Sequence, residues 1–276
     1  MPLVLVPTPL GNLRDITLRA LDVLRECELI VAEDTRVAAR LLHALNLPRK
    51  RLLSYREQNA AHVTPAILDA ARVAVVALVT DAGMPGVSDP GRDLVVAARE
   101  AGIAVEVLPG PVAFVTAAVL SGFDLAGLSF AGFVPRTAGA RRTAFAGALS
   151  AAGPTSWYES PHRIVATLEA IAEIAPRARV FVGRELTKLH EQQILGTAAD
   201  ALRALAQPVR GEIVLVIEPP PPVHIEPSDE AMDTRIDALL DAGMPAAAIA
   251  RAVASETGAD RAAAYGRVVA RKATRG

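Results

Sequence analysis

Short apolar runs, several of them rich in β-branched residues, alternate along the first half of the chain with segments whose apolar residues recur at helical spacing. Each such run is short enough to be a buried strand. The predicted strands are Leu3–Val6, Leu29–Ala32, Arg51–Tyr55, Val73–Val79 and Val105–Leu108. Thr17–Glu26 shows the helical spacing, with its leucines placed to face a core. Strands that alternate with helices in this way indicate a parallel sheet covered on both faces.

The second half of the chain has the same kinds of segment at closer spacing. Its predicted strands are Ser129–Phe133, Thr155–Tyr158, Arg179–Gly183, Gln192–Gly196 and Glu212–Ile217. The short connections favour some antiparallel pairing, so we expect a mixed α+β sheet. Ser160-Pro161 has the form of an N-cap followed by proline at the first helical position, which predicts the opening of a helix over Arg163–Ile174.

The C-terminal part of the chain predicts a linker followed by a small helical tail. Glu218–Glu230 contains five prolines, which is typical of a semi-rigid linker. The short helices predicted beyond it are Thr234–Leu240, Ile249–Ser255 and Arg261–Arg271, with glycines between them. This pattern resembles a helix-turn-helix unit, although alanine-rich segments are also simply good helix formers. We therefore predict two α/β domains at 1–111 and 112–218, a linker at 219–230 and a tail at 231–276.

Composition restricts the class of protein. Of 276 residues 51% are hydrophobic and only 4% aromatic, and the formal net charge is −1, so an RNA partner would need local basic patches. The one cysteine, Cys27, excludes a disulfide framework and a cysteine-based zinc site, and we expect it to be a small core residue. The start of the chain lacks a basic region, and no apolar run approaches the ~20 residues that span a bilayer. We expect a soluble protein of the cytoplasm.

Common catalytic and binding motifs are missing from the sequence. No Gly-x-Gly-x-x-Gly follows the first predicted strand, and there is no Gly-x-x-x-x-Gly-Lys-Ser/Thr and no Gly-x-Ser-x-Gly. The five histidines show no metal-ligand spacing, so we expect no metal.

Gly- and Pro-rich loops stand where several predicted strands end. The longest is Thr80–Gly91, with three glycines and two prolines, and Pro7–Asn12 and Pro109–Pro111 are shorter. Glycine lets the backbone approach a ligand, proline fixes the loop, and open α/β sheets bind ligands at the carboxyl ends of their strands. A long turn before the next helix would also account for Thr80–Gly91. The residues alone predict a cleft that grips a small molecule, without naming it.

Taken in order, these loops resemble one family. The matching segments are Val6–Leu13, Ala32–Arg36, Asp81–Gly91, Leu108–Pro111, Tyr158–Arg163, Arg184–Lys188 and Gly211-Glu212. Together they are similar to the ribosomal RNA small subunit methyltransferase I family, which has a tetrapyrrole-methylase-like fold. The likeness extends over nearly the whole chain.

The resemblance implies an activity, a cofactor and partners. Members transfer a methyl group from S-adenosylmethionine to the ribose 2′-hydroxyl of a cytidine in the decoding region of 16S rRNA. They act on the small ribosomal subunit, are cytoplasmic homodimers, and hold the cofactor in the cleft between two α/β domains. This chain departs from the family pattern at Met84, where threonine is usual, and at Arg56–Ala60.

Carried over by position, the resemblance nominates residues for each role. For the cofactor they are Leu10, Gly11, Asp81, Ala82, Gly83, Ser88, Val112, Ala113, Tyr158 and Glu159. Near the ribose hydroxyl the catalytic candidates are Glu185 and Lys188, with Asp34 and Arg36 across the cleft. A lysine could act as a base only if its pKa were depressed. The RNA-contact candidates are Arg136, Arg141 and Arg142, which we place in a flexible loop, with Arg49–Arg51 second.

Two other functions stay open at this point. The fold also hosts methyltransferases for small tetrapyrroles, since one fold serves several substrates. A non-catalytic ribosome-binding relative could have kept the same loops. Every charged candidate could equally be a structural ion pair at a strand end.

Overall fold

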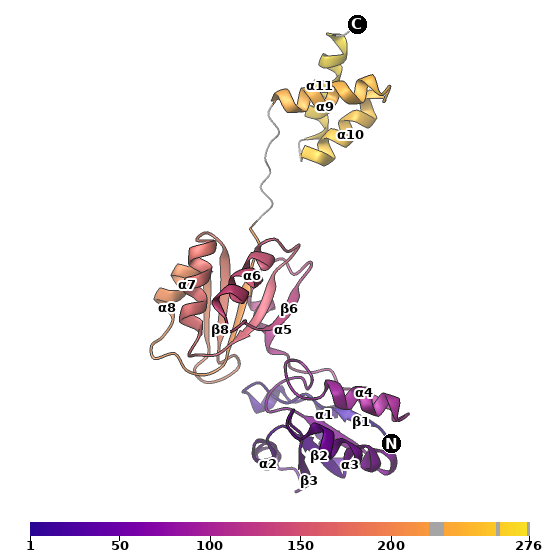
Figure 1. Ribbon diagram of the computed structural model, residues 1–276, viewed down its shortest axis with the longest axis vertical. Coiled ribbons are helices and arrows are strands. Elements are labelled where there is room, and N and C mark those ends of the chain that lie inside the picture. The colour runs from indigo at the N-terminus through magenta and orange to yellow at the C-terminus, as the bar shows by residue number, and fades with distance from the viewer. Residues whose placement is uncertain (221–228, 258–259, 275–276) are drawn as a thin grey trace. The chain divides into compact units, whose positions relative to one another are not determined.

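The computed structural model describes residues 1–220, 229–257 and 260–274. The chain forms two compact units, residues 1–220 and 221–276, which we describe separately (Figure 1). The first unit contains two five-stranded sheets and the second a bundle of three helices. Among the described residues no helix is long and apolar enough to cross a membrane.

The first sheet is parallel throughout, with strand order β3-β2-β4-β1-β5. Its strands are β1 (Leu3–Leu5), β2 (Leu29–Ala32), β3 (Arg51–Ser54), β4 (Val76–Val79) and β5 (Val105–Val107). The helices between them are a short 3-10 turn η1 (Leu13–Asp15), α1 (Leu18–Glu26), α2 (Thr35–Ala44), α3 (Ala60–Val73) and α4 (Arg92–Glu100).

Successive residues of these strands belong to two different cores, one on each face. In β2, Ile30 packs in a cluster with Leu24 of α1, whereas Val31 packs in a cluster with Leu94 of α4. Because side chains alternate across a strand, a strand buried on both faces must be apolar at every position. This is why Leu29–Ala32 has no polar residue. Each fully buried side chain of this kind contributes about 1.5–3 kcal/mol.

The predicted strand Val73–Val79 starts too early. Val73 is the last residue of α3 and is largely exposed, and the amide of Ala74 closes that helix by donating to the carbonyl of Ala70. Val73 is therefore not part of the buried run, which begins at Val76. Apolar character alone did not separate a helix end from a strand start.

The second sheet is mixed, as predicted, with order β6-β7-β10-β8-β9. Only β6 and β7 pair in parallel, and the other pairs are antiparallel. The strands are β6 (Ser129–Phe133), β7 (Thr155–Glu159), β8 (Arg179–Arg184), β9 (Gln192–Thr197) and β10 (Ile213–Ile217). The helices are α5 (Ala113–Ser121), α6 (Ala138–Leu149), α7 (Ile164–Ile174) and α8 (Ala198–Ala204). Helices α6, α7 and α8 share one core with the sheet, and α5 belongs to another core cluster that includes Val214 and Val216 of β10.

Helix α7 does not begin with the predicted Ser160 cap. Its first residue is Ile164, Arg163 occupies the N-cap position, and no side chain caps it there. The carbonyl of Ser160 accepts from the amides of Arg163 and Ile164, each at 3.1 Å, so residues 161–163 form a preceding turn. The predicted helix is confirmed, but Ser160-Pro161 begins this turn and not the helix itself.

The second unit is a three-helix bundle of α9 (Asp229–Asp241), α10 (Ala246–Thr257) and α11 (Arg261–Ala273). Its small core is built around Ile236, Ile249 and Val268. Most of the predicted linker at 219–230 lies outside the described residues. Helix α9 begins at Asp229, five residues before the predicted helix at Thr234, because this first turn is tied to α11 by ion pairs.

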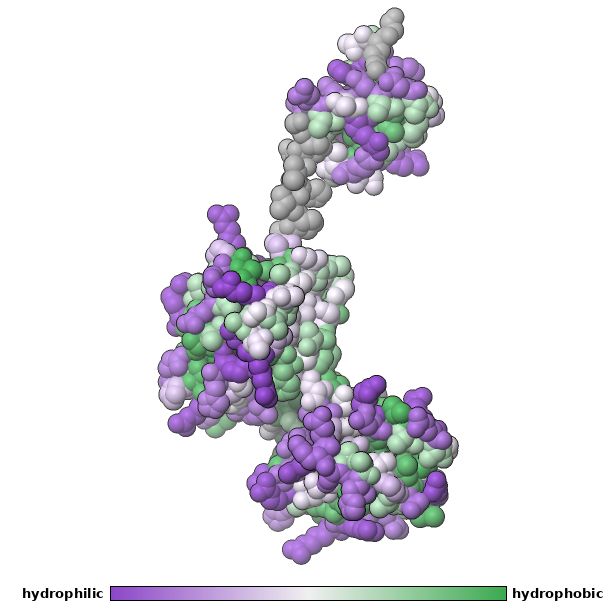
Figure 2. Space-filling view, viewed as in Figure 1, coloured by the Kyte–Doolittle hydropathy of each residue, from purple (hydrophilic) through white to green (hydrophobic). Residues whose placement is uncertain are grey.

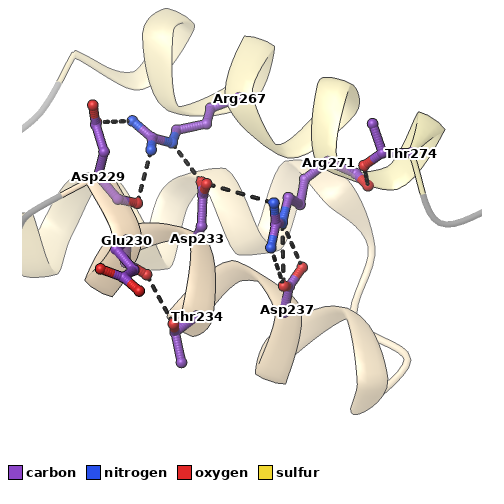
Figure 3. Close-up of polar contacts among 8 residues, drawn as sticks. All are labelled: Asp229, Glu230, Asp233, Thr234, Asp237, Arg267, Arg271 and Thr274. Carbon is purple, nitrogen blue, oxygen red and sulfur yellow. Dashed lines mark hydrogen bonds and ion pairs between the residues drawn. The ribbon is translucent and has the colours of Figure 1, made fainter.

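A ladder of charged residues joins α9 to α11 (Figure 3). Arg267 Nε lies 2.7 Å from Asp233 Oδ1, and the Arg267 guanidinium also pairs with Asp229. Arg271 Nη2 lies 2.7 Å from Asp237 Oδ2 and Nη1 lies 3.6 Å from Asp233 Oδ2. The aspartates are four residues apart, as are the arginines, so each set shares one helix face.

Candidate functional site

A cavity of about 310 Å³ lies in the first unit, between the loops that follow strands of the first sheet and residues at the ends of β6, β7 and β10 in the second sheet. Leu10 follows β1, and Val112 and Ala113 follow β5; the lining residues that follow β4 are Ala82, Gly83, Met84, Val87 and Asp89. The second sheet contributes Phe133, residues 158–161 and residues 211–214. This position, at the carboxyl ends of parallel strands, is where α/β sheets bind ligands.

The loop after β4 is held against the loop after β1 by a small antiparallel bridge. The amide of Thr8 donates to the carbonyl of Gly83 at 2.9 Å, and the amide of Gly83 donates back at 3.0 Å. Gly83 has φ +81°, and a Cβ there would lie 3.1 Å from Leu10 Cδ2. The backbone conformation therefore favours glycine, and a Cβ there would also have to displace the Leu10 side chain slightly.

Non-glycine residues in the left-handed region gather in the two loops that meet near the cavity. Ser88 has φ +63°, and Glu185 and Thr187 have φ +53° and +66°. Among the described residues Asn46 is the remaining example, and it follows the C-terminus of α2. Such strained residues persist where surrounding contacts hold them, and they concentrate at functional sites.

Asp89 contributes a carboxyl group to the cavity wall. Burial raises the pKa of Asp89 to about 6, with Glu33 and Asp81 adding to the increase and the Thr80 hydroxyl opposing it. Burial also raises the pKa of both Glu33 and Asp81. No ion pair reaches Asp89 in the described part of the chain. A partly buried carboxyl group that faces a cavity without an ion-pair partner is a candidate for ligand binding.

The aromatic wall of the cavity is Tyr158, with Phe133 beside it. The Tyr158 ring meets the rings of Phe130 and Phe133 edge to face, with centroids 4.9 and 5.7 Å apart. Burial raises the pKa of Tyr158 to about 12, so its phenol stays protonated at neutral pH. The cavity therefore presents an uncharged aromatic surface opposite the loop after β4.

Glu159 also lines the cavity, but its carboxylate is occupied by the protein itself. It accepts from the Ser160 amide and from Thr167 Oγ1, both at 2.7 Å, and lies 3.3 Å from Arg163 Nη2. The side chain is completely buried. It fastens the start of α7 to the end of β7, in place of the side-chain cap that α7 lacks.

The segment Arg184–Lys188 forms a second polar group at the same end of the molecule. Lys188 Nζ donates to Glu185 Oε1 and to Glu212 Oε2, each at 2.8 Å. A Cβ on Gly211 would lie 2.3 Å from the Glu185 carboxyl group, and one on Gly11 would lie 2.2 Å from Lys188 Cγ. Both glycines are therefore needed for the Glu185 and Lys188 side chains to occupy these positions.

The environment of Lys188 does not meet the condition for a general base. Burial lowers its pKa, but its hydrogen bonds to Glu185 and Glu212 outweigh this effect and the pKa is raised. For Glu185 burial favours the neutral acid, but the Lys188 ammonium and the Glu212 amide outweigh it, so the pKa is lowered. The pair is ionised at neutral pH, and Lys188 is present as an ammonium group.

Comparison with known proteins identifies the family. The model of the family "Tetrapyrrole (Corrin/Porphyrin) Methylases" matches residues 2–202. The chain is 43% identical over 221 residues to the ribosomal RNA small subunit methyltransferase I of Hydrogenobaculum sp. (strain Y04AAS1), covering 79% of this chain and 95% of the relative. It is 44% identical to the protein of the same name from Neisseria meningitidis serogroup B, covering 79% and 76%. The chain belongs to the ribosomal RNA small subunit methyltransferase I family.

Solved structures confirm the predicted fold. Uroporphyrin-III-C-methyltransferase from Thermus thermophilus superimposes with a TM-score of 0.53 at 23% identity, covering 78% of this chain and 93% of that one. Diphthine synthase superimposes with a TM-score of 0.59 at 15% identity, covering 79% and 90%. A further uroporphyrin-III C-methyltransferase structure, with a TM-score of 0.55 at 18% identity, covers 79% and 97% and is a complex with S-adenyl homocysteine.

Most of the cofactor residues implied by membership of the methyltransferase I family lie together. Those that line the cavity are Leu10, Ala82, Gly83, Val112, Ala113, Tyr158 and Glu159. Gly11, Asp81 and Ser88 are outside its lining. Gly11 lies against Lys188, and Asp81 Oδ1 accepts from the Asp34 amide at 3.2 Å.

Asp34 and Arg36 pair with each other instead of facing the cavity. Asp34 caps α2, accepting from the Arg36 amide at 2.8 Å and from Arg36 Nε at 3.0 Å. The Arg36 hydrogen bonds hold the pKa of Asp34 far below its usual range, which makes this carboxylate a poor base. Neither residue lines the cavity.

The predicted RNA-contact loop is partly helical. Helix α6 begins at Ala138, capped by Thr137, so Arg141 and Arg142 are helical residues and the flexible loop predicted there is wrong. Arg142 Nη2 donates to both carboxylate oxygens of Glu173 on α7, at 2.8 and 2.7 Å. Arg141 Nε is buried and has no hydrogen-bond partner among the described residues, whereas Arg136 is exposed in the preceding turn.

Several cavity residues were not predicted from the sequence. They are Met84, Val87, Asp89, Phe133, Ser160, Pro161, Leu186, Gly211, Glu212, Ile213 and Val214. All of these except Phe133, Ile213 and Val214 carried a signal, because they stand in segments that resemble the family. The strand residues Ile213 and Val214 carried none, since their apolar side chains indicate only a core.

Proposed function

We propose that this chain transfers a methyl group from S-adenosylmethionine to the ribose 2′-hydroxyl of a cytidine in the decoding region of small-subunit ribosomal RNA. The observation that carries the proposal is the identity of over 40%, across 221 residues, to proteins named ribosomal RNA small subunit methyltransferase I. By the same resemblance we place the reaction on the small ribosomal subunit, in the cytoplasm.

The cavity suits S-adenosylmethionine in size and in chemistry. At about 310 Å³ it falls in the range of small-molecule sites. Leu10, Val87 and Val112 supply apolar surface, and the carboxyl groups of Asp89 and Glu212 complement a cation. The cofactor supplies an electrophilic methyl group on a positively charged sulfur. The glycine at position 83 keeps the loops after β1 and β4 close enough to form the wall.

We assign altered roles to the four catalytic candidates, all of which lie outside the cavity lining. Lys188 acts as a fixed cation, and Glu185 holds it through their hydrogen bond of 2.8 Å. Asp34 orients Arg36, whose exposed guanidinium binds a phosphate of the RNA. Rigid alignment of the two reactants contributes about 7–11 kcal/mol of the barrier reduction, and the strained loops at Ser88 and Glu185 supply that rigidity.

For RNA contact, Arg136 is the exposed candidate beside the cavity residue Phe133. Arg142 reaches the RNA only if its ion pair with Glu173 opens. Both would bind phosphate oxygens, so affinity for the subunit falls as salt concentration rises.

We also propose that the protein is a homodimer through α5. Val115, Val119 and Leu120 of this helix are 41%, 63% and 39% exposed, and Phe133 is 57% exposed. Figure 2 shows the side of the unit that carries α5 and β6 in green and white. A helix that is apolar on all sides, as α5 is, is normally buried on all sides, so we expect a second copy of the chain to cover its exposed side. Val119→Glu is expected to shift the molar mass measured by light scattering from dimer to monomer, and an unchanged mass would contradict the interface.

The function is tested by mass mapping of ribose methylation after incubation with S-adenosylmethionine and either small subunits or naked rRNA. One added methyl group on a cytidine ribose in the decoding region is the expected product. Methylation of a porphyrinoid substrate with none on RNA would instead favour the tetrapyrrole alternative. Binding of labelled S-adenosylmethionine without any methylated product would favour a non-catalytic ribosome-binding relative.

A further inference from the structure

One face of α11 carries two cations and two exposed apolar side chains in a single row. Arg261, Tyr265, Val269 and Lys272 are spaced by four, four and three residues, so they follow one another along the helix surface. Tyr265 and Val269 are each 46% exposed, and Arg261 and Lys272 are exposed at the two ends. We call these four residues the α11 row.

The other charged face of α11 is already occupied. Arg267 and Arg271 meet the aspartates of α9 in the ladder, and these contacts raise the pKa of both arginines (Figure 3). Within residues 229–257 and 260–274, the cations without an ion pair are Arg251, Arg261 and Lys272. Two of these three stand in the α11 row.

The acidic groups of the bundle are mostly engaged away from the row. Asp229, Asp233 and Asp237 pair with the ladder arginines, and Glu256 pairs with Arg235. Asp260 caps α11 by accepting from the amides of Ala262 and Ala263, both at 3.0 Å. Most acidic groups of the bundle are therefore neutralised by arginines away from the α11 row, and the positive charges of Arg261 and Lys272 remain on the row.

A tyrosine between cations on an exposed helix matches the chemistry of unpaired RNA. Aromatic rings stack on exposed bases, while arginine and lysine bind the phosphates on either side. Helix α11 is also the second helix of the α10–α11 pair, which packs together, and in helix-turn-helix units that helix is the one presented to nucleic acid. A membrane surface would need a wider apolar face than Tyr265 and Val269 provide.

We propose that the α11 row is an RNA-binding surface, with Tyr265 stacking on an unpaired base and Arg261 and Lys272 binding phosphates. The proposal rests on the proposed function in one respect: it takes the RNA to be that of the small ribosomal subunit. It gives the C-terminal bundle the task of holding the substrate, while the chemistry stays in the first unit.

The test uses the full-length protein and a fluorescent single-stranded fragment of small-subunit decoding-region RNA, with anisotropy measured over a series of salt concentrations. The double variant Arg261→Gln/Lys272→Gln is expected to reduce the slope of log affinity against log salt by about 1.4, since each phosphate contact on a single strand contributes about 0.7. Tyr265→Ala is expected to weaken binding by about 5- to 100-fold, with the slope retained.

A matched control removes the same charge elsewhere. Arg99 and Arg177 are exposed residues of the first unit outside the cavity lining, so Arg99→Gln/Arg177→Gln should leave the salt slope unchanged. An equal loss in this control, or wild-type slope and affinity in the row variants, would overturn the proposal. So would row variants that bind RNA normally but lose binding to vesicles of phosphatidylglycerol and phosphatidylcholine.

Two further readouts separate this surface from the proposed function. Calorimetric titration with S-adenosylmethionine should be unaffected by the row variants, which shows that their first unit is intact, and thermal unfolding followed by circular dichroism should show that the C-terminal bundle is folded. If the row variants lose RNA affinity while the wild type methylates no RNA, the surface stands and the proposed function fails. If RNA affinity is unchanged while methylation by the wild type is found, the function stands and the surface is wrong.

Discussion

The β4 side and the β7 side of the cavity each contribute a carboxyl group, and the two groups differ in their surroundings. On the β7 side, Glu159 is completely buried, yet it has hydrogen bonds from Ser160 and Thr167 and an ion pair with Arg163. On the β4 side, Asp89 lies near Glu33 and Asp81, which raise its pKa further after burial has done so. Glu159 supports the fold, while Asp89 has capacity left for a ligand.

The difference teaches how to recognise a functional carboxyl group in this fold. A buried charge with partners on every side holds two elements together, and its removal leaves the partners unsatisfied. A partly buried carboxylate among other carboxylates destabilises the fold, so its presence points to a role in function. Substitutions of Glu159 and Asp89 each test one side of this comparison.

Glu159→Ala should have the largest effect, on stability. It leaves Arg163 without its ion pair and Thr167 without its acceptor, so we expect the free energy of unfolding to fall by about 3–5 kcal/mol. Denaturant unfolding followed by circular dichroism measures the loss. Glu169→Ala, at an exposed position of α7, is the control and should change stability by less than about 0.5 kcal/mol. Equal stabilities of the two variants would mean that Glu159 does not fasten α7.

Gly211→Ala should reduce methyl transfer by about 100-fold. The new Cβ would lie 2.3 Å from the Glu185 carboxyl group, at φ +88°, so Glu185 and Lys188 must move, and a displacement of about 1 Å costs roughly that factor. Steady-state kinetics should place the loss in kcat more than in KM. Gly102→Ala has a similar φ of +70° in open space and is the control for backbone strain alone. If both variants lose activity equally, the position of Glu185 is unimportant.

Asp89→Asn should weaken S-adenosylmethionine binding by about tenfold while making the protein more stable. The folded pKa of about 6 lies above the ordinary value near 4, so the wild type loses stability relative to the variant as pH rises between these values. Wild-type affinity for the cationic cofactor should fall as pH drops below about 6, because Asp89 becomes neutral.

S-adenosylhomocysteine provides the matched ligand for this test, because it lacks the charged sulfur. Calorimetry at several pH values should give it nearly the same affinity in wild type and Asp89→Asn. Parallel pH profiles for the two ligands in the wild type would show that Asp89 does not respond to the sulfonium charge.

The fold was predictable where the pattern of apolar and polar residues reflects which side chains are buried. Leu29–Ala32 and Ser129–Phe133 were predicted with the observed bounds, because their apolar or alternating pattern is typical of a strand. Val73 and Ser160 were misplaced. The sequence alone does not distinguish an exposed valine at a helix end from a valine in a strand, or a serine in a turn from a serine that caps a helix. Tertiary contacts decide such boundaries.

The site was predictable where the backbone itself forms the wall. Gly83 and Leu10 were found because their loops resemble those of the family, and a glycine-rich loop directly after a buried strand is typical of a ligand site. The partners of the charged residues were not predicted. The sequence does not reveal that Arg142 pairs with Glu173, or that Lys188 lies between Glu185 and Glu212. These pairings join residues up to 31 positions apart, and no local pattern encodes them.

Asp233→Asn in the C-terminal bundle should have the smallest effect, a decrease of a few degrees in its melting temperature. Arg267 hydrogen bonds lower the pKa of Asp233, so this ion pair stabilises the bundle above about pH 4 and is lost as pH falls through the lowered pKa. Thermal unfolding of the full chain at pH 7 should therefore separate variant from wild type, and the difference should shrink in acid. The effect is small because the ladder is near solvent, where ion pairs gain little, and because Asp229 and Asp237 still bind the two arginines. A loss as large as that of Glu159→Ala would contradict the comparison, because it would make an exposed pair equivalent to a buried one.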